Sequence, residues 1–473
     1  MKTFVDRTCI AALISTLSIC ALSSCNEARS DSRPDPDPAP DPVAQTNADA
    51  DNERARASVA HENIALVITR GLPEFGTKHG IDLIYIDPES PNFGTFVQRF
   101  TGLPYEGGEP PHHLYYSPTG RLYATGLDPR CSLMQVDLQL VSGTPVVDDV
   151  RCIPTNGHVA GEDILWRTVR GKELMYVTFM GGKGEDNMMN QGSVLAFDAT
   201  THEIVAEIVD PDDPDDPNDT FVKYPHGITA LGDTMIVSST VVPSIDITKP
   251  KIAIGNTISV IDMVRNEVTE TRVVDVSPKP AADLPSSPVE VLFLRSSIHP
   301  RLTPGVLVNT MFGGDMWYAP YDARKDQPLG EFSRIYTGAS EGTGVPLEFY
   351  SFEDKLYVSH AHPGVIKQYD LARLPALVSA GPDFHADAGA HHLVFFTTRS
   401  GRRVMASQNN LLDLRETLGM ALSAHTLTIH DLETTQKIAT IDFRGKYQLG
   451  VANVVGALDA NGTIGEEWFT HHH

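Results

Sequence analysis

The sequence predicts an all-β fold, a seven-bladed β-propeller closed by pairing of strands from the two ends of the domain. Three observations predict it: a strand-and-turn pattern that recurs seven times, further strand pairs between its copies, and a single apolar strand left over at each end. The chain shows no long apolar face with the 3.6-residue period of an amphipathic helix. A ring of small antiparallel sheets accounts for all of these features.

The recurring unit is a short β-branched or aromatic strand that ends in aspartate and is followed by a polar turn and a returning strand. Its seven copies end at Asp87, Asp137, Asp198, Asp262, Asp322, Asp370 and Asp431, at intervals of 48 to 64 residues. Such an interval fits one four-stranded blade with its loops. We expect each aspartate to cap its turn by accepting backbone N–H groups, which is a structural role.

Strand pairs between these copies complete the blades, as in residues 113–116 and 121–124, which are joined by a turn containing Pro118 and Gly120. The first copy is preceded by only one clear strand, residues 64–69. The last copy leaves a spare apolar strand near residues 450–455. We expect this C-terminal strand to become the innermost strand of blade 1, which closes the ring and hides an open sheet edge.

Residues 1–25 are predicted to be a lipoprotein signal peptide. A positively charged start precedes the apolar run of residues 9–22, which is too short to span a bilayer. The following Leu22-Ser23-Ser24-Cys25 resembles a lipobox, which implies cleavage before Cys25 and lipidation of that cysteine. An ordinary signal peptide with a coincidental cysteine is the alternative. Asn26, rather than aspartate, follows the cysteine, so we expect an exported protein anchored to the outer membrane, in the periplasm or at the cell surface.

Residues 26–58 are rich in Asp, Pro and Ala and cannot bury a core, so they are predicted to form a disordered tether before the propeller of residues 59–470. The chain carries 37 Lys and Arg against 61 Asp and Glu, a net charge of −24. This charge makes nucleic acid an unsuitable partner and leaves the lipid as the expected membrane contact. The terminal residues 471–473 could belong to a purification tag, and the sequence does not determine the oligomeric state.

Two cysteines remain after Cys25, and both fall in the second blade. Cys131 begins the predicted third strand and Cys152 ends the fourth, and the register about the turn at residues 142–144 sets the two opposite each other. In an oxidising compartment this arrangement predicts a disulfide. A reduced pair of metal-binding thiols is the alternative, because His158 follows Cys152 by only six residues.

Histidines recur where a propeller brings distant segments together. The innermost strands start at one end of the central channel, and the loops between second and third strands open at the same end. The candidate metal ligands there are His112, His113, His158, His362, His391 and His392, with His226, Glu290, Glu348 and His360 as additional candidates. Imidazoles gathered around an axis suit zinc, copper or iron, although any single histidine is more often structural. The sequence therefore predicts a metal site at this mouth and identifies no catalytic residue.

Several segments resemble the selenium-binding protein family, whose characterised bacterial members are methanethiol oxidases. They are residues 86–91 (IDPESP), the pair His112-His113, residues 192–198 (GSVLAFD), residues 288–294 (PVEVLFL) and residues 367–370 (KQYD). The resemblance is remote and spans most of the folded chain, and each piece alone is common in propellers. It implies a periplasmic, copper-linked propeller in which His112, His113 and His158 are metal residues.

The chain also departs from the family pattern. The N-terminal cysteine motif proposed to bind selenium is absent, and the histidine-bearing C-terminal motif is replaced by residues 447–453 (YQLGVAN). A ligand lost in this way could be replaced by His391, His392 or His362. Otherwise the ancestral chemistry would be lost.

The leading hypothesis is an exported copper-dependent oxidoreductase that acts on a small thiol. Copper would bind the thiolate and pass electrons to dioxygen, and the family's products are formaldehyde, hydrogen sulfide and hydrogen peroxide. One alternative is a non-catalytic surface propeller that binds a protein, a glycan or a metal through the same mouth. Another is a divalent-metal lactonase or lyase that uses Glu290 or Glu348.

Overall fold

In the computed structural model, the chain divides into two units, residues 1–61 and 62–473. The structure describes residues 63–71, 76–142, 144–183, 191–209, 224–240, 255–274, 287–311, 314–387, 389–409, 426–443, 448–449 and 455–458. The predicted signal peptide and tether lie outside these residues and stay predictions. Within the described ranges, no helix is long and apolar enough to cross a bilayer.

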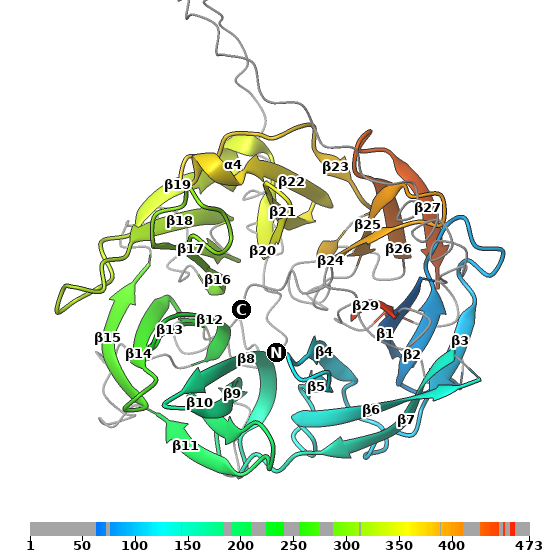
Figure 1. Cartoon of the computed structure of the whole chain (residues 1–473), viewed down its shortest axis with the longest axis horizontal. Helices are drawn as coiled ribbons and strands as arrows, with labels where there is room; N and C mark the ends of the chain where they lie inside the picture. The colour runs from blue at the N-terminus through cyan, green and yellow to red at the C-terminus, as the bar shows by residue number, and fades with distance from the viewer. Residues whose placement is uncertain are drawn as a thin grey trace, which may run out of the picture. The chain divides into compact units, whose positions relative to one another are not determined.

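The second unit is a seven-bladed β-propeller, as predicted, with its sheets arranged in a ring (Figure 1). Blade 2 consists of β4 (Pro111–Tyr116), β5 (Leu122–Gly126), β6 (Leu133–Val141) and β7 (Thr144–Cys152). Blade 3 consists of β8 (Val159–Val169), β9 (Lys172–Gly181), β10 (Gln191–Asp198) and β11 (Ile204–Ile208). Blade 4 consists of β12 (Pro225–Leu231), β13 (Thr234–Ser239), β14 (Thr257–Asp262) and β15 (Glu267–Val273).

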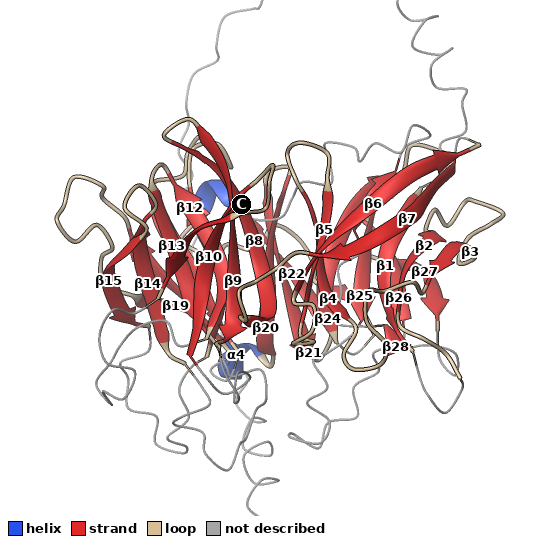
Figure 2. Cartoon of the chain, turned by 90° about the horizontal axis from the view of Figure 1, so that it is seen from below, coloured by secondary structure: helices blue, strands red, loops and turns tan. Residues whose placement is uncertain are grey.

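The remaining complete blades follow the same antiparallel order. Blade 5 consists of β16 (Pro288–Leu294), β17 (Gly305–Thr310), β18 (Asp315–Pro320) and β19 (Ser333–Thr337). Blade 6 consists of β20 (Gly344–Phe352), β21 (Lys355–His362), β22 (Val365–Asp370) and β23 (Phe384–His385). Blade 7 consists of β24 (Ala390–Thr397), β25 (Arg403–Asn409), β26 (Thr426–Asp431) and β27 (Lys437–Asp442). Short helical turns occur at α4 (Gly338–Glu341) and η3 (Leu371–Arg373). The side view in Figure 2 shows how completely strands dominate the described chain.

Blade 1 closes the ring through the C-terminal strands. β28 (Gln448–Leu449) and β29 (Val455–Leu458) both pair antiparallel with β1 (Ile64–Arg70), which is followed by β2 (Gly80–Tyr85) and β3 (Phe96–Phe100). The expected pairing of the two ends of the domain is confirmed. Its ladder contacts lie on either side of residues 450–454, which fall outside the described residues.

Six of the seven turn aspartates have the capping role expected of them. The expectation was wrong for Asp137, because β6 runs on to Val141 and the carboxylate of Asp137 accepts from the side chains of Gln135 and Arg151 instead. Asp198 Oδ1 accepts hydrogen bonds from the backbone N–H groups of Thr200 and Thr201, at 2.9 and 2.8 Å. Asp262 Oδ1 accepts from Val264 N–H in the same way. The core lies between adjacent sheets, where apolar side chains of one blade pack on those of the next. The blades thus bury their faces against each other, and the ends of the inner strands remain available for polar residues.

A β-bulge interrupts the inner strand of every blade from 2 to 7. The register shifts fall between Pro111 and Leu114, Gly161 and Ile164, Pro225 and Ile228, Pro288 and Val291, Pro346 and Glu348, and Ala390 and Leu393. A bulge places extra residues outside the ladder and re-aims their side chains. The acidic residues and histidines of these six inner strands lie in the bulges or directly beside them.

Cys131 and Cys152 form a disulfide with a Cα–Cα distance of 5.5 Å. The predicted register was wrong in detail: Cys152 of β7 pairs with Met134, and Cys131 lies just before β6. The bond therefore ties the segment that enters β6 to the end of β7. Because both sulfur atoms are in this bond, the alternative of two metal-binding thiolates is wrong for this structure.

Replacing both cysteines with serine should lower the free energy of unfolding by about 3 kcal/mol, because a bond across 21 residues of sequence restricts the unfolded chain. Urea denaturation of the oxidised wild type and the double variant measures this difference. Reduced wild type is the control and should unfold like the variant. Equal stability of oxidised protein and variant would contradict the prediction.

Candidate metal centre

The inner strands bring nine buried ionisable side chains together at the centre of the ring, and we call this group the axial cluster. None of the nine is more than 9% exposed. They are His112 and His113 of β4, Glu162 and Asp163 of β8, His226 of β12, Glu290 of β16, Glu348 of β20, and His391 and His392 of β24. Five imidazoles and four carboxyl groups, from six different blades, therefore share one buried region.

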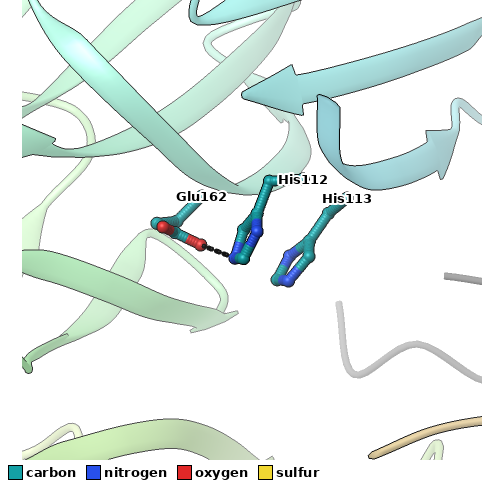
Figure 3. A group of neighbouring side chains, drawn as sticks. All are labelled: His112, His113 and Glu162. Atoms are coloured by element: carbon teal, nitrogen blue, oxygen red, sulfur yellow. Dashed lines mark ion pairs between the residues drawn. The ribbon is translucent and has the colours of Figure 1, made fainter. Parts of the chain in front are cut away.

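Within the axial cluster, three groups have ligand atoms that all lie within 4.8 Å of one another. They are His112 with His113 and Glu162; Asp163 with His226 and Glu290; and Glu348 with His391 and His392. Figure 3 shows the first group, in which the two imidazoles of β4 lie face to face and Glu162 contacts one of them. Each group brings together three donor atoms of the kinds that metal ions bind, which is the number of protein ligands in many catalytic sites.

His113 joins the three groups into one site. Its ring centroid lies 5.0 Å from that of His392 and 6.3 Å from that of His226, with nearly perpendicular ring planes in both pairs. With a metal–nitrogen bond of about 2.1 Å, a ring centroid lies about 3.2 Å from the ion, so two ligands at angles from right to tetrahedral have centroids about 4.5–5.3 Å apart. The first distance fits that range, and the second is near the limit for ligands on opposite sides of an ion.

Carboxylates of the cluster contact the edges of its imidazoles. Glu162 Oε2 lies 3.0 Å from His112 Nε2 and 3.5 Å from His226 Nε2. On the other edge of the His226 ring, Nδ1 lies 3.2 Å from Glu290 Oε1. In blade 7, His391 Nε2 lies 3.3 Å from a Glu348 oxygen. Carboxylates in such positions orient metal-ligating imidazoles and make them more basic.

Some of these buried atoms make no hydrogen bond of normal geometry within the described residues. They are both carboxylate oxygens of Glu162, Oε1 of Glu290 and Nδ1 of His226; all but Oε1 of Glu162 take part in the contacts between carboxylates and imidazoles given above. Buried polar groups are almost always hydrogen-bonded, because a group deprived of water is costly to leave unmatched. A cation is the partner that a set of carboxylate oxygens and imidazole nitrogens accommodates best. The residues of the axial cluster thus fit a metal ion.

Electrostatics divide the carboxyl groups of the cluster into two kinds. Burial raises the pKa of Glu290 and of Glu348 well above the ordinary value, and the neighbouring carboxylates Asp163 and Glu162 add to the effect. Burial acts in the same direction on Glu162, but the adjacent His112 and His226 outweigh it, and the pKa of Glu162 is lowered. Glu162 is therefore the carboxylate that is held ionised by histidines.

His113 is favoured in the neutral form that binds metals. Burial lowers its pKa, and the neighbouring His112 lowers the pKa further, against the opposing effect of Asp163. A histidine must give up its proton before one of its nitrogens can bind a metal. The surroundings of His113 therefore remove part of the competition between proton and metal.

Seven of the sequence-predicted site residues meet in the axial cluster: His112, His113, His226, Glu290, Glu348, His391 and His392. His158 does not join them. Its Nδ1 lies 2.9 Å from the hydroxyl of Ser193, and its Nε2 lies 2.9 Å from Glu207, on the outer strand β11 of the same blade. His158 precedes β8 and contacts its own sheet, so the structure places it apart from His112 and His113.

The two histidines of β21 also lie apart from the cluster. His360 is fully buried, its ring lies 5.7 Å from that of Tyr336, and burial lowers its pKa to about 3. His362 lies at the end of the same strand and is exposed. Neither belongs to the groups that could hold a metal within the described part of the chain.

Sequence reasoning missed Glu162 and Asp163. It placed the start of the third inner strand at His158, whereas the bulge that faces the axis comes between Gly161 and Ile164. The available signal was the pair of acidic residues inside the otherwise apolar first seven residues of strand β8. Two adjacent ionisable residues in a buried strand correspond to the double histidines of β4 and β24.

Comparison with known proteins shows the fold and no family. No family model and no curated protein matches the chain. Among solved structures, the X-ray structure of a hypothetical selenium-binding protein from Sulfolobus tokodaii superposes with a TM-score of 0.61 at 15% identity, covering 87% of this chain and 97% of that chain. Two further structures are more distant. Apo AztD from Citrobacter koseri superposes with a TM-score of 0.41 at 11% identity, covering 86% of this chain and 100% of that chain. The nidogen/laminin complex superposes with a TM-score of 0.37 at 12% identity, covering 68% of this chain and 94% of that chain. The chain is therefore similar in fold to a protein described as selenium-binding.

Proposed function

We propose that the protein is a metal-dependent oxidoreductase whose ion is held in the axial cluster, with His113, His226 and His392 as the first candidates for ligands. One observation carries this proposal: five imidazoles and four carboxyl groups from six blades are buried together, with the ring of His113 beside both other rings. Structural ion pairs alone do not require so many metal-ligating groups in one place.

The donor set favours a transition metal. The nine residues offer imidazole nitrogens and carboxylate oxygens, which suit copper, iron and zinc. We propose copper because the reaction proposed below needs a redox-active ion. Copper, when bound, would supply affinity for a thiolate and the capacity to pass electrons to dioxygen.

The chain's own residues would orient the ligands and keep the site dry. Glu290 and Glu348 contact His226 and His391, and the burial of the cluster excludes bulk water and large substrates. The proposed substrate is a small alkanethiol. Its carbon would be oxidised by two electrons to an aldehyde with oxygen from water, its sulfur would leave as hydrogen sulfide, and dioxygen would be reduced to hydrogen peroxide. The name of the Sulfolobus tokodaii protein, a selenium-binding protein, is consistent with affinity for sulfur-like atoms.

Elemental analysis of protein purified without chelator tests the proposal, followed by an assay of hydrogen peroxide and hydrogen sulfide from methanethiol. We expect about one copper ion per chain and turnover that depends on it. Lack of stoichiometric copper after anaerobic reconstitution would overturn the copper proposal, and tightly bound calcium or magnesium would favour a lactonase or lyase using Glu290 or Glu348. Copper without thiol turnover would overturn the enzymatic proposal and leave a metal-binding propeller.

A further inference from the structure

A buried tyrosine hydroxyl lies between two members of the axial cluster. Tyr115 of β4 is 3% exposed, and its hydroxyl donates a short hydrogen bond to Asp163 Oδ1 of the neighbouring blade. The same hydroxyl oxygen lies 2.9 Å from His113 Nδ1. Burial raises the pKa of Tyr115 well above its usual value, with Asp163 adding to the effect, so the phenol keeps its proton.

The hydrogen atoms in this chain of three groups can be assigned by counting. A phenol has one proton to donate, and Tyr115 donates it to Asp163, so its oxygen can only accept from His113. The proton of a neutral His113 ring therefore sits on Nδ1. Asp163 Oδ1 lies 3.5 Å from the same nitrogen and favours the same tautomer. The lone pair of the ring is then on Nε2, the nitrogen that these contacts do not use.

We infer that Tyr115 and Asp163 are positioning residues that select the tautomer of His113 and present its Nε2 to the metal ion. This inference rests on the proposed function of the axial cluster as a metal centre. A hydrogen bond on one nitrogen of a ligating histidine fixes which nitrogen binds the metal and how the ring is oriented. Partners of this kind typically contribute about 10–100-fold to metal affinity.

Two substitutions separate the tautomer effect from simple loss of a contact. Tyr115→Phe removes the hydroxyl but leaves Asp163 near Nδ1, so copper affinity should fall by about 10-fold. Asp163→Asn should weaken it more, towards about 100-fold, because the new amide can donate to Tyr115, which then donates to Nδ1 and favours the wrong tautomer. Chelator competition with Cu(II) measures the affinities, and electron paramagnetic resonance of Cu(II) reports a changed nitrogen ligand.

Tyr123→Phe is the matched control. Tyr123 lies opposite Tyr115 in the β4–β5 ladder and is equally buried, and its hydroxyl lies 2.9 Å from His202 Nε2, outside the axial cluster. This substitution also removes a hydrogen bond between a tyrosine of blade 2 and a histidine, here His202 of blade 3. It should lower the melting temperature of the metal-free protein about as much as Tyr115→Phe does, with no change in copper affinity or spectrum.

The outcomes distinguish the inference from the function on which it rests. Wild type that binds no copper would overturn the proposed metal centre. Wild type that binds copper, with Tyr115→Phe and Asp163→Asn binding as tightly and giving the same spectrum, would overturn the positioning role alone. A smaller loss in Asp163→Asn than in Tyr115→Phe would contradict tautomer selection. If Tyr115→Phe fails to fold, Asp163→Asn measured against Tyr123→Phe decides the question.

Discussion

His113→Ala and His392→Ala should each weaken metal binding by more than about 100-fold, since loss of outer partners alone typically removes about 10–100-fold. Both rings are buried in the axial cluster and lie edge to face at 5.0 Å, where one ion can contact both. Elemental analysis after dialysis against a weak chelator should find metal in the wild type and almost none in either variant. Circular dichroism and thermal melting confirm that the variants keep the propeller.

His158→Ala and His362→Ala are the controls for this prediction. His158 contacts Ser193 and Glu207 in its own blade, and His362 is exposed at the end of β21. Both variants should retain metal at the wild-type stoichiometry. Loss of metal in His158→Ala, with retention in His392→Ala, would instead support the ligand set implied by the family resemblance and contradict the axial cluster as the site.

Glu348→Gln and Glu162→Gln should change the stability of the metal-free protein in opposite directions near neutral pH. Burial raises the pKa of Glu348 above its unfolded value, so above about pH 4.5 the folded state must either keep a proton or bury a charge. The wild type then loses stability as pH rises from that value towards the raised pKa. Glutamine removes this penalty, so the advantage of Glu348→Gln should grow with pH across the window.

For Glu162, the expected effect of ionisation on the stability of the metal-free protein has the opposite sign. Burial opposes its ionisation, but His112 and His226 lower its pKa overall, so its charge contributes stability above the unfolded pKa that is lost as pH falls through the folded pKa. Glu162→Gln should therefore destabilise the metal-free protein at neutral pH. Urea titrations between pH 4 and pH 8 test both variants, and each tenfold change in proton affinity corresponds to about 1.4 kcal/mol. The same sign for both variants would show that the electrostatic assignment is wrong.

The ring was predictable because its signals are local and repeated. Each copy of the strand-and-aspartate pattern indicates one sheet. Asp198 is an example, because its carboxylate caps the turn that follows the strand. The closure was also predictable, since β1 lacked an inner neighbour and a spare strand remained at the other end. The register of the disulfide was missed for two reasons. The β6–β7 turn is tighter than expected, with Val141 already paired with Thr144, and the irregularity between Asp137 and Leu138 shifts the pairing by one more residue.

The site was predictable in part, and His158 and Glu162 show why. Both lie near the start of the inner strand of blade 3. His158 follows a turn, as the other candidate histidines do, whereas Glu162 lies within the strand and matched none of the candidates. Only the position of the bulge decides which residues face the axis, and a bulge depends on pairing with the next strand. Tyr115 was hidden for another reason: an aromatic residue in a buried strand has the appearance of core.

The bulges at the starts of six inner strands have an evolutionary consequence. Residues such as His112, Glu162 and His391 lie where the ladder is interrupted, so their side chains can be exchanged without altering the hydrogen bonding that holds each blade. The strands that hold the blades together are thereby independent of the side chains that face the axis, much as variable loops are independent of a rigid scaffold. A descendant of this chain could acquire a different set of polar groups around the axis by a few replacements at these positions while its architecture stayed the same.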